Sequence, residues 1–394
     1  MDNITHSLVG VALADLAMGR RGTKAQRPLF VGGGIIAANL PDLDVAYSWI
    51  TPPPIGYLLH HRGHTHTVLG LAALALVLVF AYRLLPSVRG MRVSGHVRFW
   101  LLIAIGLASH LALDSLNSYG VHPFYPIDNE WYFGDAVFIL EPSLWLGLVP
   151  AAAWNGRTRA APLAAALAMA LLLCTIALTR EVPLDSVAGL AIGAVFLAWI
   201  TRRLSPPVRA AAALAVFLMI VAGFVGTSRL ARGAVVEALS PELRGQLVDV
   251  ILSPNPSSPL CWSVIAVELR EADGAYVLWR GTLSLQPAWK APTGCASHKF
   301  LGPRAARIVG DGRLALRDVV HQPLQRLRAL ADRDCWVRAW LRFGRAPVVE
   351  GNSLFDLRFS ERPGREFTAM RLTAREGCPP YVPNWGMPRA DLLR

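Results

Sequence analysis

Apolar runs dominate the first half of the chain and are separated by short polar connections. Two short runs come first, near 6–18 and 28–40; they are either short tilted spans or a hairpin lying partly in the membrane interface. Six longer runs approach the roughly 20 residues that a helix needs to cross a bilayer. They lie near 67–83, 98–115, 136–153, 161–179, 184–200 and 209–227. The pattern therefore predicts a polytopic α-helical membrane domain of about eight segments, two of them short.

From about residue 228 the pattern changes to short runs rich in β-branched and aromatic residues, separated by turn-forming residues. These runs are Trp262–Leu269, Ala275–Leu285, Arg313–Val320, Trp336–Phe343 and Leu354–Phe359. A helix is expected near 321–331. We therefore predict two domains, a membrane-embedded helical domain over residues 1–227 and a small, mostly-β soluble domain over residues 228–394.

The distribution of charged residues along the chain agrees with this division into a membrane domain and a soluble domain. Charged residues make up 17% of the chain, against about 25% in a typical soluble protein. Residues 1–226 hold 15 Lys/Arg and 11 Asp/Glu, whereas residues 227–394 hold 24 and 16. The net charge of +12 is not arranged in basic stripes interleaved with aromatic residues, so we expect contacts with membrane lipids and no binding of nucleic acid.

Basic residues also predict how the chain is oriented. Thirteen of the fifteen Lys and Arg residues in the first half fall in alternate connections, and the other connections hold only Arg62 and Arg180. The positive-inside rule places the basic connections in the cytoplasm. Eight crossings then put both chain ends, and the C-terminal domain, outside the membrane. Four cysteines of that domain fit two disulfides in one of three pairings: Cys261, Cys295, Cys335 and Cys378.

Histidine and aspartate residues gather in the first 125 positions. Eight of the ten histidines lie between residues 6 and 122, four of them within the run from His60 to His66. Histidine is the commonest metal ligand in proteins. His110 and Asp114 lie one helical turn apart in a predicted span, where polar groups are costly and usually functional. Asp42 and Asp44 are close enough to repel unless a cation or proton lies between them.

The predicted orientation brings all these residues to the outer side, which favours a single metal site. The candidate ligands are His6, Asp42, Asp44, His61, His64, His66, His110 and Asp114. Alternatives remain for each motif taken alone: a pH-sensing patch for the histidine run, and a structural hydrogen-bonded pair for His110 and Asp114. Histidine and carboxylate ligands favour zinc, with manganese or iron as other choices.

Such a site would activate a water molecule for attack on an electrophile. The candidate catalytic residues are Asp44 and His60, as general bases, and Arg62. Arg62 could bind an anionic group such as a phosphate, or it could simply form an ion pair with Asp42 or Asp44.

The motifs, in order, resemble the YdjM-type family of inner-membrane proteins, which are described as membrane-bound metal-dependent hydrolases. The resemblance covers about residues 1–150. The matching segments are Thr5-His6, Asn39–Asp44, His61–Thr67 and Ser109–Asp114, continuing to Tyr119-Gly120. The resemblance implies hydrolysis with a bound metal, and it implies no role for the β domain.

We therefore predict a membrane-bound metal-dependent hydrolase that uses a metal-activated water at the outer face of a bacterial inner membrane. Its expected substrate is a lipid or another amphiphile with a phosphoester or ester bond. The rival hypotheses are a non-enzymatic protein that handles metal ions or protons, and a scaffold that presents the β domain.

Overall fold

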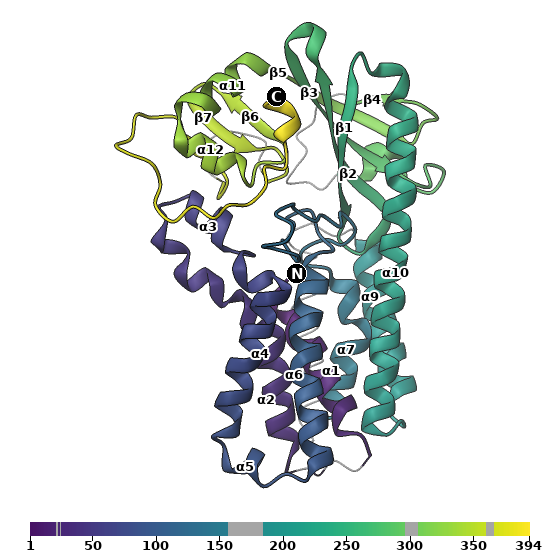
Figure 1. Ribbon diagram of the computed structural model, residues 1–394. Helices are drawn as coiled ribbons and strands as arrows, with labels where there is room; N and C mark the ends of the chain where they lie inside the picture. The colour runs from purple at the N-terminus through teal and green to yellow at the C-terminus, as the bar shows by residue number, and fades with distance from the viewer. Residues whose placement is uncertain (21–22, 24, 157–183, 296–305, 360–365) are drawn as a thin grey trace.

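The computed structural model describes residues 1–20, 23, 25–156, 184–295, 306–359 and 366–394. A helical bundle forms one end of the molecule, and the C-terminal region sits on top of it (Figure 1). Three helical segments are long and apolar enough to cross a membrane: Arg27–Ile50, Val93–Asp114 and Pro206–Glu242. The bent pair Ile55–His66 and Val68–Arg83 adds a fourth if it is one broken span. Within the described residues this is fewer than the eight segments expected.

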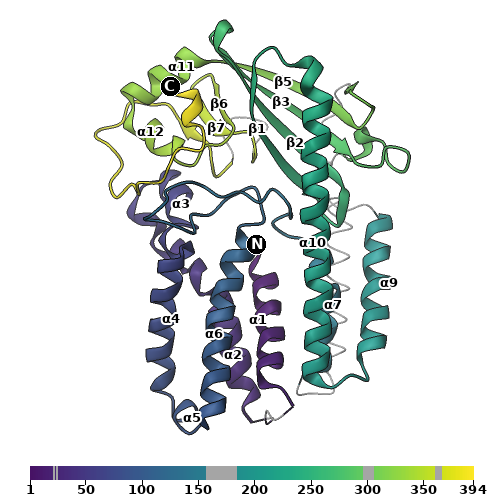
Figure 2. The ribbon, with the colours of Figure 1, turned by 45° about the vertical axis from the view of Figure 1, so that its right-hand side comes forward.

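The elements described in the N-terminal part are all helices. These are α1 (Asn3–Met18), α2 (Arg27–Asn39), η1 (Leu40–Ile50), α3 (Ile55–His60), η2 (His64–His66), α4 (Val68–Arg83), α5 (Pro86–Arg89), α6 (Val93–Asp114), η3 (Pro142–Leu144), α7 (Trp145–Trp154), α9 (Leu184–Thr201) and α10 (Pro206–Leu239). Helix α1 is central in the bundle, with α2 and α6 on one side and α7 and α10 on the other (Figure 2).

Two expected spans account for part of the lower count. The segment 136–153 is helical only from Pro142, because the Glu141 side chain accepts a hydrogen bond from the Ser143 N–H and Pro142 occupies the first helical position. Both features favour a helix start. The expected span at 161–179 lies outside the described residues.

Helix α10 joins the two parts of the molecule. Its 34 residues give a length of about 51 Å, enough to run the full depth of the bundle and continue along the C-terminal sheet (Figure 2). The domain boundary expected between residues 227 and 228 falls inside this helix, and the division into two domains stays a prediction.

The C-terminal region is mostly β, as predicted, with two antiparallel sheets. The larger has the order β1-β2-β3-β5-β4 and the smaller β6-β7-β8. The elements are η4 (Ser240–Glu242), β1 (Gln246–Asn255), β2 (Ser258–Arg270), η5 (Glu271–Asp273), β3 (Ala275–Ser284), η6 (Pro292–Cys295), β4 (Arg307–Val309), β5 (Leu314–Pro323), α11 (Leu324–Arg333), α12 (Cys335–Leu341), β6 (Pro347–Glu350), β7 (Ser353–Asp356), β8 (Met370–Arg371) and η7 (Ala390–Leu392). Disulfides join Cys261 to Cys295 and Cys335 to Cys378.

Other elements cover both faces of the larger sheet, and apolar side chains of its strands point to each face. Leu252 and Val264 belong to the same apolar cluster as residues of α10. On the opposite face, Ile251 and Val267 belong to an apolar cluster with Trp340 and other residues of α11 and α12. Because successive side chains of a strand point to opposite faces, the sheet lies as a layer between α10 and the two short helices.

The segment Trp336–Phe343, expected to be a strand, is instead helix α12 followed by a turn. The Asp334 carboxylate accepts hydrogen bonds from the N–H groups of Trp336 and Val337, which caps the helix. Trp336, Val337, Trp340 and Leu341 are its large buried residues. That spacing matches one face of a helix, so the strand prediction was wrong here because aromatic content outweighed periodicity.

Candidate metal centre

Four side chains converge at the end of the bundle that faces the C-terminal region. Asp42, His66, His110 and Asp114 each offer one ligand atom, and these atoms all lie within 4.8 Å of one another. The Nε2 atoms of His66 and His110 are 3.0 Å apart. Oδ1 of Asp42 lies 3.5 Å from both of these nitrogens. His66, His110 and Asp114 are buried.

The other nitrogen of each ring is a hydrogen-bond donor, which leaves Nε2 as an acceptor when the ring is neutral. Nδ1 of His110 lies 2.7 Å from the carbonyl oxygen of Ala38 and must donate to it. Nδ1 of His66 lies 3.0 Å from Oδ2 of Asp44. Imidazoles held in this way through Nδ1–H are typical of metal ligands. Two nitrogen lone pairs and two carboxylates then meet at one point, and they repel one another unless a cation or proton lies between them.

Asp44 organises the residues around this point. Its carboxylate accepts hydrogen bonds from the Arg62 N–H at 2.8 Å and the Thr65 hydroxyl at 2.8 Å. Oδ1 lies 3.1 Å from Nδ1 of His61. Asp42, Asp44 and His61 form a second group of potential ligands, next to the first and sharing Asp42 with it. Together the two groups make up the Asp/His cluster: Asp42, Asp44, His61, His66, His110 and Asp114.

Local backbone geometry explains how the cluster is assembled. Asp42 and Asp44 lie in η1 directly after α2, and a 3₁₀ helix places residues two apart on different sides. The two carboxylates therefore reach opposite edges of the His66 ring, at Nε2 and Nδ1. The chain turns at Arg62, whose φ of 58° lies in the left-handed region.

Comparisons with known proteins agree with the sequence motifs. A family model described as YdjM inner membrane protein matches residues 1–182. The chain is 34% identical to inner membrane protein YbcI of Escherichia coli (strain K12) over 132 residues, which are 33% of this chain and 70% of that protein. This chain belongs to the YdjM family. No solved structure matches it.

All six residues of the cluster lie in the part of the chain that matches the YdjM family model, and so do three further histidines that were considered for the site, His6, His60 and His64. His6 stacks on His110 with ring centroids 4.0 Å apart, and its Nε2 lies 3.2 Å from Asp114. His60 turns away and pairs with the Thr51 hydroxyl at 2.8 Å. His64 is exposed and packs against Trp385 of the C-terminal region. The structure thus does not bring His60 or His64 to the cluster.

Arg62 contacts a different carboxylate from those expected. Its Nε lies 3.0 Å from Oδ2 of Asp114, while Asp44 accepts only from its main-chain N–H. Its Nη1 donates to Oδ1 of Asn117 at 2.9 Å. The guanidinium group also lies 4.8 Å from the centre of the Tyr119 ring. Arg62 is buried, so it holds a fixed positive charge beside the cluster.

Asn117 and Tyr119 are absent from the candidate residues predicted above, although both border the cluster through Arg62. Burial raises the pKa of Tyr119 well above its usual value, so its hydroxyl stays a hydrogen-bond donor. A signal for Asn117 was present in the sequence, since it lies close after Asp114 at the end of an apolar span, where an amide is costly to bury unless it is paired.

Proposed function

We propose that this protein is a membrane-bound metal-dependent hydrolase, with a divalent metal held by Asp42, His66, His110 and Asp114. The observation that supports it most is that two histidine Nε2 atoms lie 3.0 Å apart between two carboxylates, an arrangement that a bound cation would stabilise. A mixed set of imidazole and carboxylate ligands suits zinc. Zinc bound there would supply Lewis acidity and lower the pKa of a water molecule.

The surrounding residues have roles that fit hydrolysis. His61 lines an adjoining cavity, and Asp44 holds its Nδ1, which leaves Nε2 to accept a proton from the attacking water. Arg62 lines the same cavity and would stabilise negative charge that develops on the substrate. Asp44 acts through the rings that it positions. His60, which bonds to Thr51, has no role in this proposal.

We also propose that the chain crosses the membrane several times, with the cluster and the C-terminal region on the outer side. The connection that contains α5 and the arginines Arg83, Arg89 and Arg92 lies at the opposite end of the bundle (Figure 1). Positive charge in connections favours the cytoplasmic side. A periplasmic reporter fused to the C-terminus should therefore be active, and an inactive reporter with an active cytoplasmic reporter would reverse this orientation.

The decisive experiment is metal analysis of the full chain purified in detergent, alongside variants. We expect stoichiometric zinc in the unaltered protein, and its loss in His110→Ala and His66→Ala. His96→Ala is the matched control, because His96 lies on the same helix as His110, near the opposite end. Unaltered metal content in both cluster variants would contradict the site.

Hydrolysis is tested on the same preparations with p-nitrophenyl esters and phosphoesters. Chelation should abolish turnover, and added zinc should restore it. A protein that binds zinc at the cluster but hydrolyses none of these esters would favour the non-enzymatic rivals, in which the metal has a structural or transport role.

A further inference from the structure

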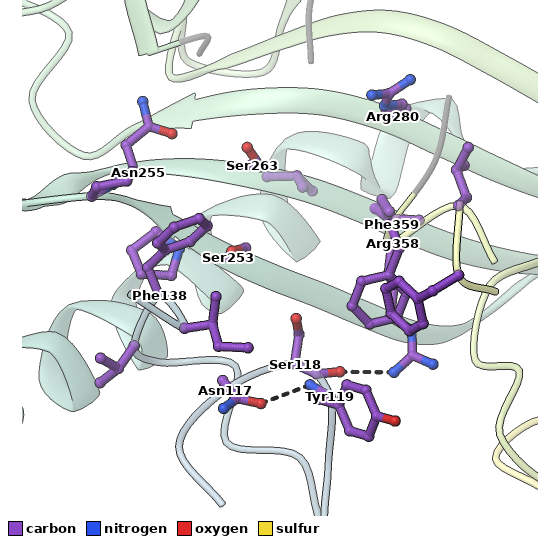
Figure 3. A pocket seen from close by; sticks show the side chains of 18 of the residues that line it. Asn117, Ser118, Tyr119, Phe138, Ser253, Asn255, Ser263, Arg280, Arg358 and Phe359 are labelled. Atoms are coloured by element: carbon purple, nitrogen blue, oxygen red, sulfur yellow. Dashed lines mark hydrogen bonds between the residues drawn. The ribbon is translucent and has the colours of Figure 1, made fainter. Parts of the chain in front are cut away.

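A cavity of about 340 Å³ separates the Asp/His cluster from the C-terminal sheet. Its floor comes from the bundle and includes His61 and Arg62. Its roof comes from strands β1, β2 and β3, where Ser253 and Ser263 lie directly opposite one another in the β1–β2 pair (Figure 3). Because both serines are small, they leave the space open. The C-terminal region therefore covers a chamber that borders the cluster at His61.

The floor carries two buried hydrogen-bond donors with no partner among the described residues. These are Nδ2 of Asn117 and the hydroxyl of Tyr119, in side chains that are 4% and 5% exposed. Oδ1 of Asn117 already accepts from Arg62 and from the Tyr119 N–H, which fixes the amide with its donor side free. Buried donors are normally satisfied. Both residues line the cavity, so a ligand that accepts hydrogen bonds would satisfy them.

Charge in the lining favours an anion. Three arginines line the cavity, Arg62, Arg280 and Arg358, and the described lining residues include no Asp or Glu. All three have partners: Arg62 pairs with Asp114 and Arg358 with Asp356, both outside the lining, and Arg280 also has an interaction partner.

Arg358 uses most of its donors on Asp356 and on the carbonyl oxygens of Ser118 and Phe343. Arg62 bonds through Nε and Nη1, which leaves its Nη2 to donate to a planar or tetrahedral oxyanion. A metal at the cluster would add further positive charge.

One wall of the cavity is apolar and continues to the surface of the protein. Phe138 and Ile139 belong to the segment between α6 and α7, and Phe138 faces the strands across the cavity (Figure 3). Ile139 and the adjacent Leu140 are exposed large apolar residues. Phe359 adds a second aromatic ring from the C-terminal region. A ligand that enters along this wall needs an apolar substituent.

We propose that the cavity binds an organic phosphate with an apolar substituent, such as a phospholipid headgroup with the first part of its chains. The phosphate lies beside Arg62, Asn117 and Tyr119, next to the cluster, and the apolar part lies along Phe138. The C-terminal region is then the roof of the substrate chamber. This inference rests on the proposed function only in treating the bound phosphate ester as the substrate.

Binding is measured by calorimetry on the full chain in detergent, so that no turnover is needed. The probe is the phosphonate analogue of dihexanoyl phosphatidic acid, in which carbon replaces the ester oxygen and prevents hydrolysis. Inorganic phosphate and dihexanoylglycerol test the two halves of the ligand separately. We expect the phosphonate to bind at least tenfold more tightly than either. Equal affinity for inorganic phosphate, or for the neutral lipid, would overturn the proposal.

Variants then locate the binding. Ser263→Phe should fill the cavity and weaken phosphonate binding at least tenfold without loss of zinc. Ser258→Phe on the same strand, outside the cavity lining, is the matched control and should bind normally. Phe138→Ala, which only removes volume, should weaken binding of the phosphonate and leave inorganic phosphate unaffected. Normal phosphonate binding by folded Ser263→Phe and Phe138→Ala proteins would place the ligand elsewhere.

The two proposals can fail separately. Phosphonate binding in the cavity by a protein that hydrolyses no ester would remove the hydrolase and keep the ligand class. Zinc-dependent hydrolysis of p-nitrophenyl phosphate by a protein that does not bind the phosphonate would keep the hydrolase and overturn the cavity proposal.

Discussion

At the scale of single residues, Asp44 differs from the other acidic groups of the cluster in what it contacts. It holds one nitrogen of His66 and one of His61, together with the Thr65 hydroxyl. A residue that orients ligands supports metal affinity without providing the principal bonds, and its loss typically costs 10–100-fold in affinity. Loss of the Asp44 carboxylate should therefore reduce metal affinity less than loss of the Asp114 carboxylate.

We predict that Asp44→Asn weakens zinc binding by about 10–100-fold, while Asp114→Asn abolishes it. Competition with a chromogenic chelator measures both. Asp128→Asn is the control, because Asp128 is a partly exposed carboxylate away from the cluster that accepts a hydrogen bond from the Tyr132 hydroxyl. A loss in Asp44→Asn as complete as that in Asp114→Asn would instead make Asp44 a direct ligand.

His122 offers a pH-dependence that comes from a histidine outside the cluster. Its ring lies between Trp131 and Trp385, 3.8 Å and 4.2 Å from theirs, and burial lowers its pKa to about 3. The unfolded chain, with a histidine pKa near 6.5, therefore binds more protons between pH 6.5 and 3. The stability due to neutral His122 is complete above about pH 6.5 and is lost as pH falls towards 3.

We predict that His122→Phe flattens the loss of thermal stability below pH 6.5, where His122 contributes up to about 1.4 kcal/mol per pH unit. Thermal unfolding between pH 7 and 4 tests this. His321→Phe, at an exposed position, should keep the slope of the unaltered protein, and an unchanged slope in His122→Phe would show that the ring is not kept neutral.

Sequence reasoning identified the cluster but could not choose among adjacent histidines. The motifs were available from residue types, and the side of the membrane, inferred from charge, stays a prediction. Which histidines point inward depends on the left-handed turn at Arg62, and no spacing rule anticipates that turn at a non-glycine residue. His60 and His66 are therefore chemically alike in the sequence and lie in different surroundings in the fold.

At the scale of elements, α1 and α2 approach so closely that only glycine fits between them. A Cβ atom built at Gly34 would overlap the main-chain oxygen of Gly10, and one built at Gly10 would overlap that of Gly34. Small residues allow this type of contact between membrane helices. The approach matters for the site because α1 carries His6 and α2 leads into η1.

We predict that Gly34→Ala lowers stability by about 1–3 kcal/mol, the usual cost of overpacking. Gly32→Ala is a matched control on the same helix, where an added Cβ meets no atom within 4 Å, and it should be neutral or stabilising by up to about 1 kcal/mol. Thermal unfolding in detergent, followed by zinc retention, measures both. Equal effects of the two substitutions would contradict the close contact.

The type of an element was predictable where the apolar pattern of a segment and its length indicated the same structure. Strands β2, β3 and β5 lie where runs rich in β-branched and aromatic residues, bounded by turn-forming residues, predicted them. Helix α12 was missed because its two tryptophans suggested a strand, although Asp334 was a readable cap. The extended chain before Pro142 was missed because an apolar composition cannot show that Glu141 is bound by the distant Ser257 N–H.

At the scale of the whole molecule, a buried ion-pair network joins the bundle to the C-terminal region. Arg345 makes two hydrogen bonds of 2.8 Å with Asp135, which precedes α7, and two more with Asp249 in β1. Burial by itself would raise the pKa of Asp249, but the charge of Arg345 holds it below its usual value. Sequence could not reveal this pairing, because the partners are 96 and 210 residues apart from Arg345.

The same network sets the position of the chamber roof, because β1 carries both Asp249 and Ser253. Arg345→Met would leave Asp135 and Asp249 as buried carboxylates without their main partner, and removing one member of a buried ion pair costs about 3–5 kcal/mol. We predict that this variant loosens the C-terminal region, so that limited proteolysis releases it at least tenfold faster, while zinc remains bound. Arg313→Met, which breaks an exposed pair with Asp311, should be cut at the normal rate.

The phosphonate should bind Arg345→Met weakly even though the cluster is intact, because the roof is no longer held over the cavity. Normal proteolysis and normal binding in Arg345→Met would show that the two parts are held together by apolar packing along α10 alone.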